Sequence, residues 1–366
     1  MTVRVRDASA KAPSDWDTLT VEPPGGHVLQ GANWADHRAE QGWRPWFLRF
    51  SDDRAALVLT VRQPPMPGFL AYAPRGPIAA GDAPAAVAAR AVALADWVRA
   101  RGGTLLVVDP ELEAGKGYEP LIRRRGFRPT EEVQASRHRL LLRFAPEVTE
   151  EMVLKGVAKQ TRQRIRAAEK AGTRVVEDRT GEHFDAFGEL LLRTAERKDF
   201  YIGSMSATAR WWRRAMGAAQ ARAWVALNDG RLLGGLVVYL HGGHLATAYS
   251  ADDASLRDAL PGTMHLLRWT AIREALAAGA PFIDLGGVDV PGARRLPARG
   301  EPLWGLLEHK RSFGAEWVES TAAHQLVIRP WVHRAGRGAR AVYRLVRRRG
   351  AFPGSGRAGG AAGEDG

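Results

Sequence analysis

One stretch of the sequence constrains the fold more than any other: Pro281-Phe-Ile-Asp-Leu-Gly-Gly-Val-Asp289. Its residues 282–285 predict a buried strand that runs into the glycine pair Gly286-Gly287. Glycines at a strand end let the backbone turn sharply, or let another molecule approach it closely. A helix pattern at residues 262–278 ends at Gly279, just before this strand. We therefore expect a sheet with a cleft at the end of this strand.

A lysine follows the strand after a short loop. Lys310 lies in Leu307-Glu-His-Lys-Arg-Ser-Phe-Gly314, just before an aromatic residue and a glycine. An ammonium group at a strand-end cleft is suited to neutralising negative charge that develops on a reacting carbonyl. The alternative is a core strand, a tight turn and a solvated lysine.

The composition bounds the class of protein. The 366 residues are enough for two domains, and 45% hydrophobic with 25% charged residues is typical of a globular chain. Cysteine is absent, which excludes disulfides, thiolate zinc sites and cysteine nucleophiles. A formal net charge of +13 favours a polyanionic partner: nucleic acid, a nucleotide pyrophosphate or an anionic membrane. The amino end lacks the apolar core of a signal peptide and no apolar run reaches the length of a bilayer, so we expect a cytoplasmic protein.

The first half of the chain predicts one α/β unit. Strands at residues 45–50 and 55–62, a helix at 85–101 and a buried strand at 104–109 follow one another, and a strand at 138–144 is expected to close the unit. Asp109 stands at the carboxyl end of its strand, before a proline. Its carboxylate is placed either to orient an amine nucleophile or to cap the turn that the proline begins.

The second half opens with a basic helix. Residues 153–171 predict one helix, on which five cations spaced four, three, four and four apart share a stripe: Lys155, Lys159, Arg162, Arg166 and Lys170. Such a stripe is either a solvated face or the contact surface for an anionic partner. A strand at 173–177, a helix at 181–197, and strands at 223–227, 232–240 and 244–250 follow. After Gly314 we expect a strand pair, 315–321 with 325–328, and a basic helix at 334–348.

Motifs along residues 28–320 resemble, in order, those of the FemABX family, the peptidyltransferases that build peptidoglycan bridge peptides from aminoacyl-tRNA. The residues that carry the resemblance are Leu29-Gln30 with Trp34 and Arg38, the loop Tyr72-Ala-Pro-Arg-Gly-Pro77, the basic helix, Thr194 to Tyr201, Tyr249-Ser250, and the strand end at Gly286 with Lys310. The chain departs from the family pattern at Arg38, where a lysine is usual, and at His309, where another aromatic residue is usual. The family's Gly-Glu pair near residues 321–325 is missing.

The resemblance implies an α+β fold of two tandem GNAT-like domains, each a mixed β-sheet flanked by helices. The first domain would span residues 1–146, completed by 318–348, the second 147–317, and residues 349–366 would be a disordered tail. It also implies transfer of an aminoacyl group from tRNA to the side-chain amine of the third stem-peptide residue. The acceptor would be UDP-MurNAc-pentapeptide or lipid II. We expect a monomer that needs no cofactor and no metal.

The resemblance also implies roles for single residues. Lys310 would be catalytic, and Asp109 is the second catalytic candidate because of its position at a strand end, not because of the resemblance. The substrate-binding set would be Arg38, Tyr72, Arg75, Arg197, Tyr201 and Tyr249. The tRNA-binding set would be His309, Lys155, Lys159, Arg162 and Arg166.

Two other classes of function stay open. An ordinary GNAT acyltransferase would use acyl-CoA, but residues 257–262 lack the glycine spacing of a pyrophosphate loop. A non-catalytic relative would bind tRNA or membrane without turnover. The basic helix at 334–348, with Trp331 at its edge, could hold RNA or contact the inner face of an anionic membrane.

Overall fold

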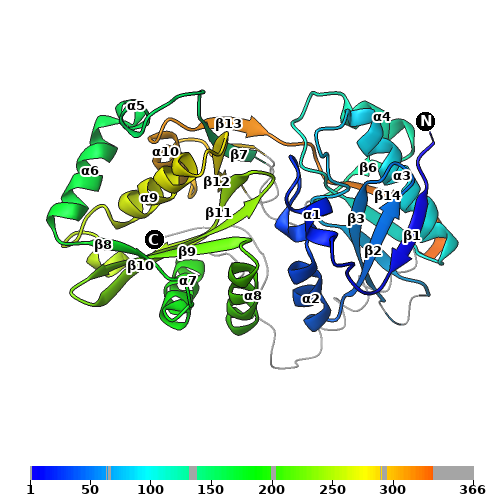
Figure 1. Ribbon diagram of the computed structural model, residues 1–366, viewed down its shortest axis with the longest axis horizontal. Coiled ribbons are helices and arrows are strands. Elements are labelled where there is room, and N and C mark those ends of the chain that lie inside the picture. Colours follow the sequence, from blue (N-terminus) through cyan, green and yellow to red (C-terminus); the bar gives the residue numbers. More distant parts are fainter. Residues whose placement is uncertain are drawn as a thin grey trace, which may run out of the picture.

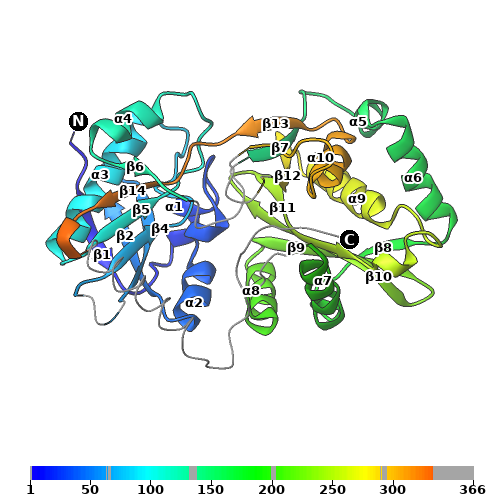
Figure 2. The ribbon, with the colours of Figure 1, turned by 180° about the vertical axis from the view of Figure 1, so that it is seen from behind.

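Two seven-stranded sheets stand side by side in the computed structural model, which describes residues 2–332 apart from 63, 65–66, 132–137, 199–202, 289 and 291–294 (Figure 1; from behind in Figure 2). The first sheet has the order β1 (Val5–Ser9), β2 (Arg44–Phe50), β3 (Ala55–Val61), β4 (Leu70–Ala73), β5 (Leu105–Val108), β14 (His324–Val327) and β6 (Arg128–Pro129). The second has the order β13 (Glu316–Glu319), β7 (His138–Arg143), β12 (Phe282–Gly287), β11 (His244–Asp252), β10 (Arg231–His241), β9 (Ala221–Asn228) and β8 (Arg174–Glu177).

The two sheets repeat one pairing plan. In each, four strands pair antiparallel, and the fourth then pairs in parallel with a fifth: β4 with β5, and β11 with β12. Beyond the fifth strand lies an antiparallel strand from a distant part of the chain, β14 in one sheet and β7 in the other. Each sheet is therefore mixed, and the expected α+β fold of two tandem GNAT-like units is confirmed.

Helices cover the sheets on both faces. With the first sheet lie α1 (Trp16–Thr20), the 3-10 turn η1 (Val28–Gln30), α2 (Ala32–Glu40), α3 (Pro84–Ala100) and α4 (Tyr118–Arg124). With the second lie α5 (Glu150–Gly156), α6 (Lys159–Lys170), α7 (Phe184–Lys198), α8 (Met205–Gly217), η2 (Ala254–Leu256), α9 (Thr263–Ala277) and α10 (Trp304–Arg311). In Figure 1, α7 and α8 lie on one face of the second sheet, and α6 and α9 on the other. None of the described helices is long and apolar enough to cross a bilayer.

An apolar cluster joins the two units. Trp34 of α2 packs on Trp211 of α8 with ring centroids 4.7 Å apart. Trp212, one residue on, is fully buried against Phe184 and Tyr249. The tryptophan pair thus packs α8 against its neighbours, and one hydrophobic cluster contains buried residues of both units.

Two features differ from what the sequence led us to expect: the sheet in which β7 lies, and the pairing of β13 with β14. β7, expected in the first unit, pairs with β12 and β13 in the second sheet. β13 and β14 do not pair with each other, because β13 stays in the second sheet while β14 crosses to β5 in the first. A short half-apolar strand fits either sheet equally well, so only the tertiary fold decides its partner. The expected basic helix at 334–348 and the tail at 349–366 lie outside the described residues.

The expected single helix at 153–171 is broken in two. α5 ends at Gly156, and the backbone N–H of Ala158 bonds to Ser312 O at 2.8 Å instead of continuing the helix. The Arg162 guanidinium donates back to Lys155 O at 3.1 Å and so caps α5. Lys155, on the other helix, pairs with Glu151. The proposed stripe of five cations therefore does not exist as one surface; Lys159, Arg166 and Lys170 stay exposed on α6.

Gly262, at the start of α9, is a point where the fold tolerates no side chain. Its φ is +92°, and a Cβ there would lie 2.1 Å from Arg164 O of α6. We expect Gly262→Ala to lower the free energy of unfolding by about 2–4 kcal/mol. The penalty for an alanine in the left-handed conformation adds to the penalty for the clash between its methyl group and Arg164 O. Urea denaturation measures the loss.

Gly300 supplies the matched control for this prediction. It has a similar φ of +94°, but nothing lies within 4 Å of a Cβ placed there. Gly300→Ala should therefore lower the free energy of unfolding by only about 1–2 kcal/mol, which is the penalty of the backbone conformation alone. Equal losses at the two positions would show that α6 yields to the methyl group and that the contact is not tight.

Candidate active site between the two units

The parallel strands β11 and β12 separate where the candidate site begins. They pair only from Leu245 to Ala246 with Ile283 to Asp284. Beyond this point a cavity of about 490 Å³ opens between the strands and reaches the first unit. It is lined by His27, Leu29, Trp34, Arg75, Glu111, Arg139, Leu191, Gly203, Thr208, Trp211, Tyr239, His241, Ala246, Thr247, Ala248, Tyr249, Ser250, Arg268, Asp284, Leu285, Gly286, Gly287, Leu306 and Lys310. We call it the interdomain cavity.

A β-bulge shapes one wall of the interdomain cavity. The register of β10 with β11 jumps between Val237, opposite Tyr249, and Val238, opposite Thr247, which leaves Ala248 without a partner. Bulges re-aim side chains and are frequent beside active sites. Here the half-buried Tyr249 lines the cavity, with its ring set edge-on to Trp212 at 5.0 Å.

Lys310 reaches this cavity from α10, a helix that the sequence analysis did not predict. Its side chain is 5% exposed, and its Nζ donates to Gly287 O at 2.8 Å. Gly286 has φ +81°, and a Cβ there would lie 3.2 Å from this Nζ. The glycine pair therefore makes a turn that no other residue adopts easily, and it keeps the space beside the ammonium open.

The first unit presents Arg75 to the same cavity on a loop that Gln30 holds in place. The Gln30 amide donates to Pro74 O at 2.6 Å and accepts from Leu57 N at 2.8 Å. A Cβ on Gly76 would lie 2.7 Å from Gln30 Nε2, so the loop closes on the glutamine. Gln30, from one motif, and the loop at Pro74 to Gly76, from another, therefore pack together.

Asp109 lies behind this loop. One carboxylate oxygen accepts from Tyr72 Oη at 2.8 Å and the other from the backbone N–H of Arg75 at 2.5 Å. Burial raises the pKa of Asp109 to about 6, against the opposing effect of the Arg75 charge. Neither Asp109 nor Tyr72 is among the residues that line the cavity. The structure therefore shows Asp109 as the anchor of the Arg75 loop; its expected catalytic part stays a prediction.

A buried ion cluster, which was not predicted from the sequence, joins the units beside Arg75. The Glu111 carboxylate contacts the Arg139 guanidinium and lies 3.5 Å from His27 Nε2, and Arg139 lies 3.8 Å from Asp284. Burial favours the neutral acid, but the charges of Arg139 and of the other cationic groups around it together hold the pKa of Glu111 well below its usual value. The only signal in the sequence was the position of Glu111, two residues after the strand end at Asp109.

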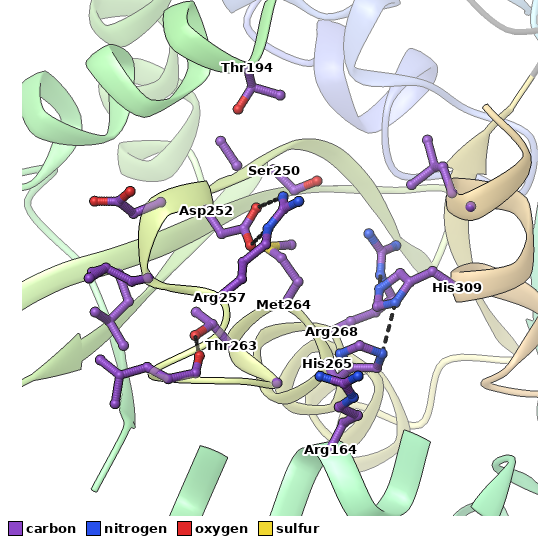
Figure 3. Close-up of a pocket in the computed structure, with 18 of the residues that line it drawn as sticks. Arg164, Thr194, Ser250, Asp252, Arg257, Thr263, Met264, His265, Arg268 and His309 are labelled. Atoms are coloured by element: carbon purple, nitrogen blue, oxygen red, sulfur yellow. Dashed lines mark hydrogen bonds and ion pairs between the residues drawn. The ribbon is translucent and has the colours of Figure 1, made fainter. Parts of the chain in front are cut away.

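A second cavity, of about 470 Å³, lies beside α9 (Figure 3). We call it the α9 cavity. It is lined by Arg164, Thr194, Arg197, Leu233, Ser250, Ala251, Asp252, Asp253, Leu256, Arg257, Leu260, Gly262, Thr263, Met264, His265, Arg268, Pro302, Gly305, Leu306 and His309. Arg257 is held by Asp252 through two hydrogen bonds, of 2.7 and 2.5 Å. The exposed Arg164 and Arg197 have no ion pair within the described part of the chain.

The two cavities meet at one wall. Ser250, Arg268 and Leu306 line both. On α10, His309 lines the α9 cavity, and the next residue, Lys310, lines the interdomain cavity. Molecules held in the two cavities would therefore approach each other next to Lys310.

The structure brings together only some of the expected site residues. Lys310, Arg75 and Tyr249 line the interdomain cavity, whereas Arg197 lines the α9 cavity with His309. Arg38 lines neither; its guanidinium lies over the rings of Trp34 and Trp43, 5.6 and 5.1 Å from their centroids. The four basic residues expected to hold tRNA, Lys155, Lys159, Arg162 and Arg166, line neither cavity. Tyr201 lies outside the described residues.

Comparison with known proteins agrees with this architecture. Residues 12–117 match the model of the FemAB family, and residues 155–302 match the model of the acetyltransferase (GNAT) domain. The crystal structure of FemX is similar with a TM-score of 0.73 at 18% identity, over 93% of this chain and 99% of that one. A conserved protein of unknown function from Bacteroides thetaiotaomicron has a TM-score of 0.51 at 12% identity, over 88% and 98% of the two chains. No curated protein sequence matches this one.

Two sheets with one pairing plan define a tandem GNAT-like fold, and the matches to the models of the GNAT domain and the FemAB family support a transferase. Within that class, the match of the amino-terminal unit to the FemAB family and the likeness to FemX confirm the resemblance to the FemABX family.

Proposed function

We propose that this protein transfers an aminoacyl group from tRNA to the side-chain amine of the third stem-peptide residue of a peptidoglycan precursor. The acceptor is UDP-MurNAc-pentapeptide or lipid II. The aminoacyl end of the tRNA occupies the α9 cavity, and the acceptor peptide occupies the interdomain cavity. The resemblance to the FemABX family supports the type of reaction.

One observation carries the proposal: the two cavities share a wall, and consecutive residues of α10 line one each. A transfer between two large substrates needs two binding sites that meet at a single point. His309 lies where the terminal adenosine would stack. Lys310 lies where the acceptor amine would meet the ester.

The chemistry needs no protein nucleophile. The acceptor amine attacks the aminoacyl ester carbon, a tetrahedral oxyanion forms, and the C–O bond to the ribose breaks as the hydroxyl leaves. A proton passes from the amine to the departing oxygen. The Lys310 ammonium, held on Gly287 O in a largely buried position, stabilises the oxyanion more strongly than it would in water.

The deciding experiment uses purified protein, tRNA charged with a labelled amino acid, and UDP-MurNAc-pentapeptide. Label should appear on the muropeptide, and ribonuclease added before the reaction should abolish it. Transfer that survives ribonuclease, or that appears only with acyl-CoA, would exclude tRNA as the donor.

An acyl-CoA donor is the second candidate, and one observation favours it. The first turn of α9, Thr263 to His265, lines the α9 cavity next to Arg164. A helix N-terminus beside an arginine suits a phosphate. Acetyl-CoA in place of charged tRNA, in the same assay, separates the two donors.

Arg197 is proposed to bind substrate rather than to assist the chemical step. Because it shares the α9 cavity with His309, we expect Arg197→Ala to raise the KM for the aminoacyl-tRNA several-fold, with kcat little changed. Steady-state kinetics with each substrate varied in turn measure both constants. If only the KM for the acceptor increased, Arg197 would instead belong to the acceptor site.

A further inference from the structure

Arg268 is a buried cation that the proposed reaction has not used. It lies on α9, is 2% exposed, and its side chain lines both the α9 cavity and the interdomain cavity. Its Nε donates to His309 Nε2 at 3.2 Å (Figure 3). Its Nη1 donates to Leu285 O at 3.3 Å. Within the described residues it makes no ion pair. A buried guanidinium with only neutral partners is costly, because desolvation is not offset by an opposite charge.

The two histidines next to Arg268 are neutral and do not offset its positive charge. An arginine nitrogen can only donate, so His309 Nε2 must accept, and the proton of the neutral ring then lies on Nδ1. That N–H donates to His265 Nε2, 3.2 Å away. Burial, with the charges of Arg164 and Arg268, lowers the pKa of His265 to about 4. The chain from Arg268 through His309 to His265 is therefore neutral beyond the arginine.

Two buried cations meet the same strand end from two helices. Arg268 of α9 holds Leu285 O, and Lys310 of α10 holds Gly287 O, on either side of Gly286. All three residues line the interdomain cavity, and Gly286 carries no side chain to fill the space between the cations. An arginine has five N–H donors, and Arg268 uses only two in the described part of the chain.

We propose that Arg268 and Lys310 form one binding site for a small oxyanion at the junction of the two cavities. In the proposed aminoacyl transfer, on which this second part rests, the oxyanion is the tetrahedral intermediate, and Arg268 is a second catalytic cation that contacts it. The same arginine orients the His309 ring on the donor side. The cost of burying the guanidinium is then recovered only when the negative charge is present.

The anion site is tested without any turnover. Binding of inorganic phosphate is measured by calorimetry at constant ionic strength, for the wild type, Arg268→Gln, Lys310→Met and Arg273→Gln. Arg273 is the matched control, since it lies on the same helix but half-exposed, in an ion pair with Glu150 at 2.9 Å. We expect Arg268→Gln and Lys310→Met each to weaken binding by about 10-fold or more, as loss of a charged hydrogen bond does. Arg273→Gln should leave it unchanged. Absence of binding to the wild type, or equal binding to all four proteins, overturns the site.

The catalytic part is tested by transfer from aminoacyl-tRNA. Arg268→Gln should lower kcat by about 100-fold while donor KM changes far less, and Arg268→Lys should restore part of kcat. Normal kcat in Arg268→Gln overturns the catalytic role. If the wild type itself does not use aminoacyl-tRNA, the proposed function fails, while phosphate binding still decides the anion site.

Thermal unfolding separates this role from a purely structural one. Because Arg268 is buried without an opposite charge among the described residues, its replacement by glutamine should leave Tm unchanged or raise it. If Arg268 only supported Leu285 and His309, Arg268→Gln would instead lower Tm and leave phosphate binding intact. Should Arg268→Gln fold poorly, Arg268→Lys keeps the charge and answers the same questions through its phosphate affinity.

Discussion

Replacing Lys310 by methionine should reduce the rate of aminoacyl transfer by about 100-fold or more, while the protein stays folded. Methionine keeps the length and most of the volume of the side chain but removes the charge. The ammonium is the group that lies at the meeting point of the two cavities, held by Gly287 O. Single-turnover kinetics with charged tRNA measure the chemical step, and circular dichroism checks the fold.

Lys116→Met is the matched control for this variant. Lys116 lies on the surface of the first unit, where its side chain is 69% exposed and 3.9 Å from Glu113. Its replacement removes the same charge without touching either cavity, so the rate should not change. Near-normal turnover in Lys310→Met would remove the lysine from the mechanism, and equal losses in both variants would point to net charge instead.

Glu111→Gln is expected to lower the free energy of unfolding by about 3–5 kcal/mol, because it leaves the buried Arg139 without its main counter-charge. Asp284, at 3.8 Å, is too far to replace it fully. The cluster joins the two units, so the loss should appear as a lower midpoint in urea denaturation of the whole protein. Glu113→Gln is the control: its partner Arg143 is half-exposed, at 3.0 Å, and the change should cost less than about 1 kcal/mol.

The pH dependence gives a second check on Glu111. Its pKa in the folded protein is held well below the usual 4.5, chiefly by Arg139 against the effect of burial. The carboxylate therefore stabilises the fold fully above about pH 4.5, and this contribution is lost as the pH falls further. The difference in stability between wild type and Glu111→Gln should shrink between pH 5 and pH 3. A difference that does not change with pH would mean that the charge of Glu111 is not what holds the cluster.

Local signals predicted the parts of this protein that depend on neighbours in the sequence. The strand before Gly286, the helix before Gly279 and the turn chemistry around them each follow from a few consecutive residues. The tandem fold could be recognised because several such motifs stand in order. Lys310 was found for the same reason, although the helix that carries it was not predicted.

Helix 153–171 shows where local reasoning failed. Its pattern is continuous, but the backbone of Ala158 finds a better acceptor in Ser312, over 150 positions away. A hydrogen bond to a distant loop replaced one turn of helix, and the guanidinium of Arg162 turned inward to cap α5. The RNA-binding surface predicted from that spacing lost two of its members for this reason.

The sequence by itself determined the fold class, the strand that ends at the glycine turn, and the lysine that follows it, because these depend on short-range sterics and on patterns of apolar residues. Only the tertiary structure decided that β7 lies in the second sheet, that two cavities share a wall at Arg268, and that Glu111 contacts Arg139 and lies close to His27. These contacts join residues far apart in the chain, and each residue alone looks like an ordinary surface charge. Strand pairing and burial are collective properties of the fold, so no local pattern could specify which of the many charges would end up buried together.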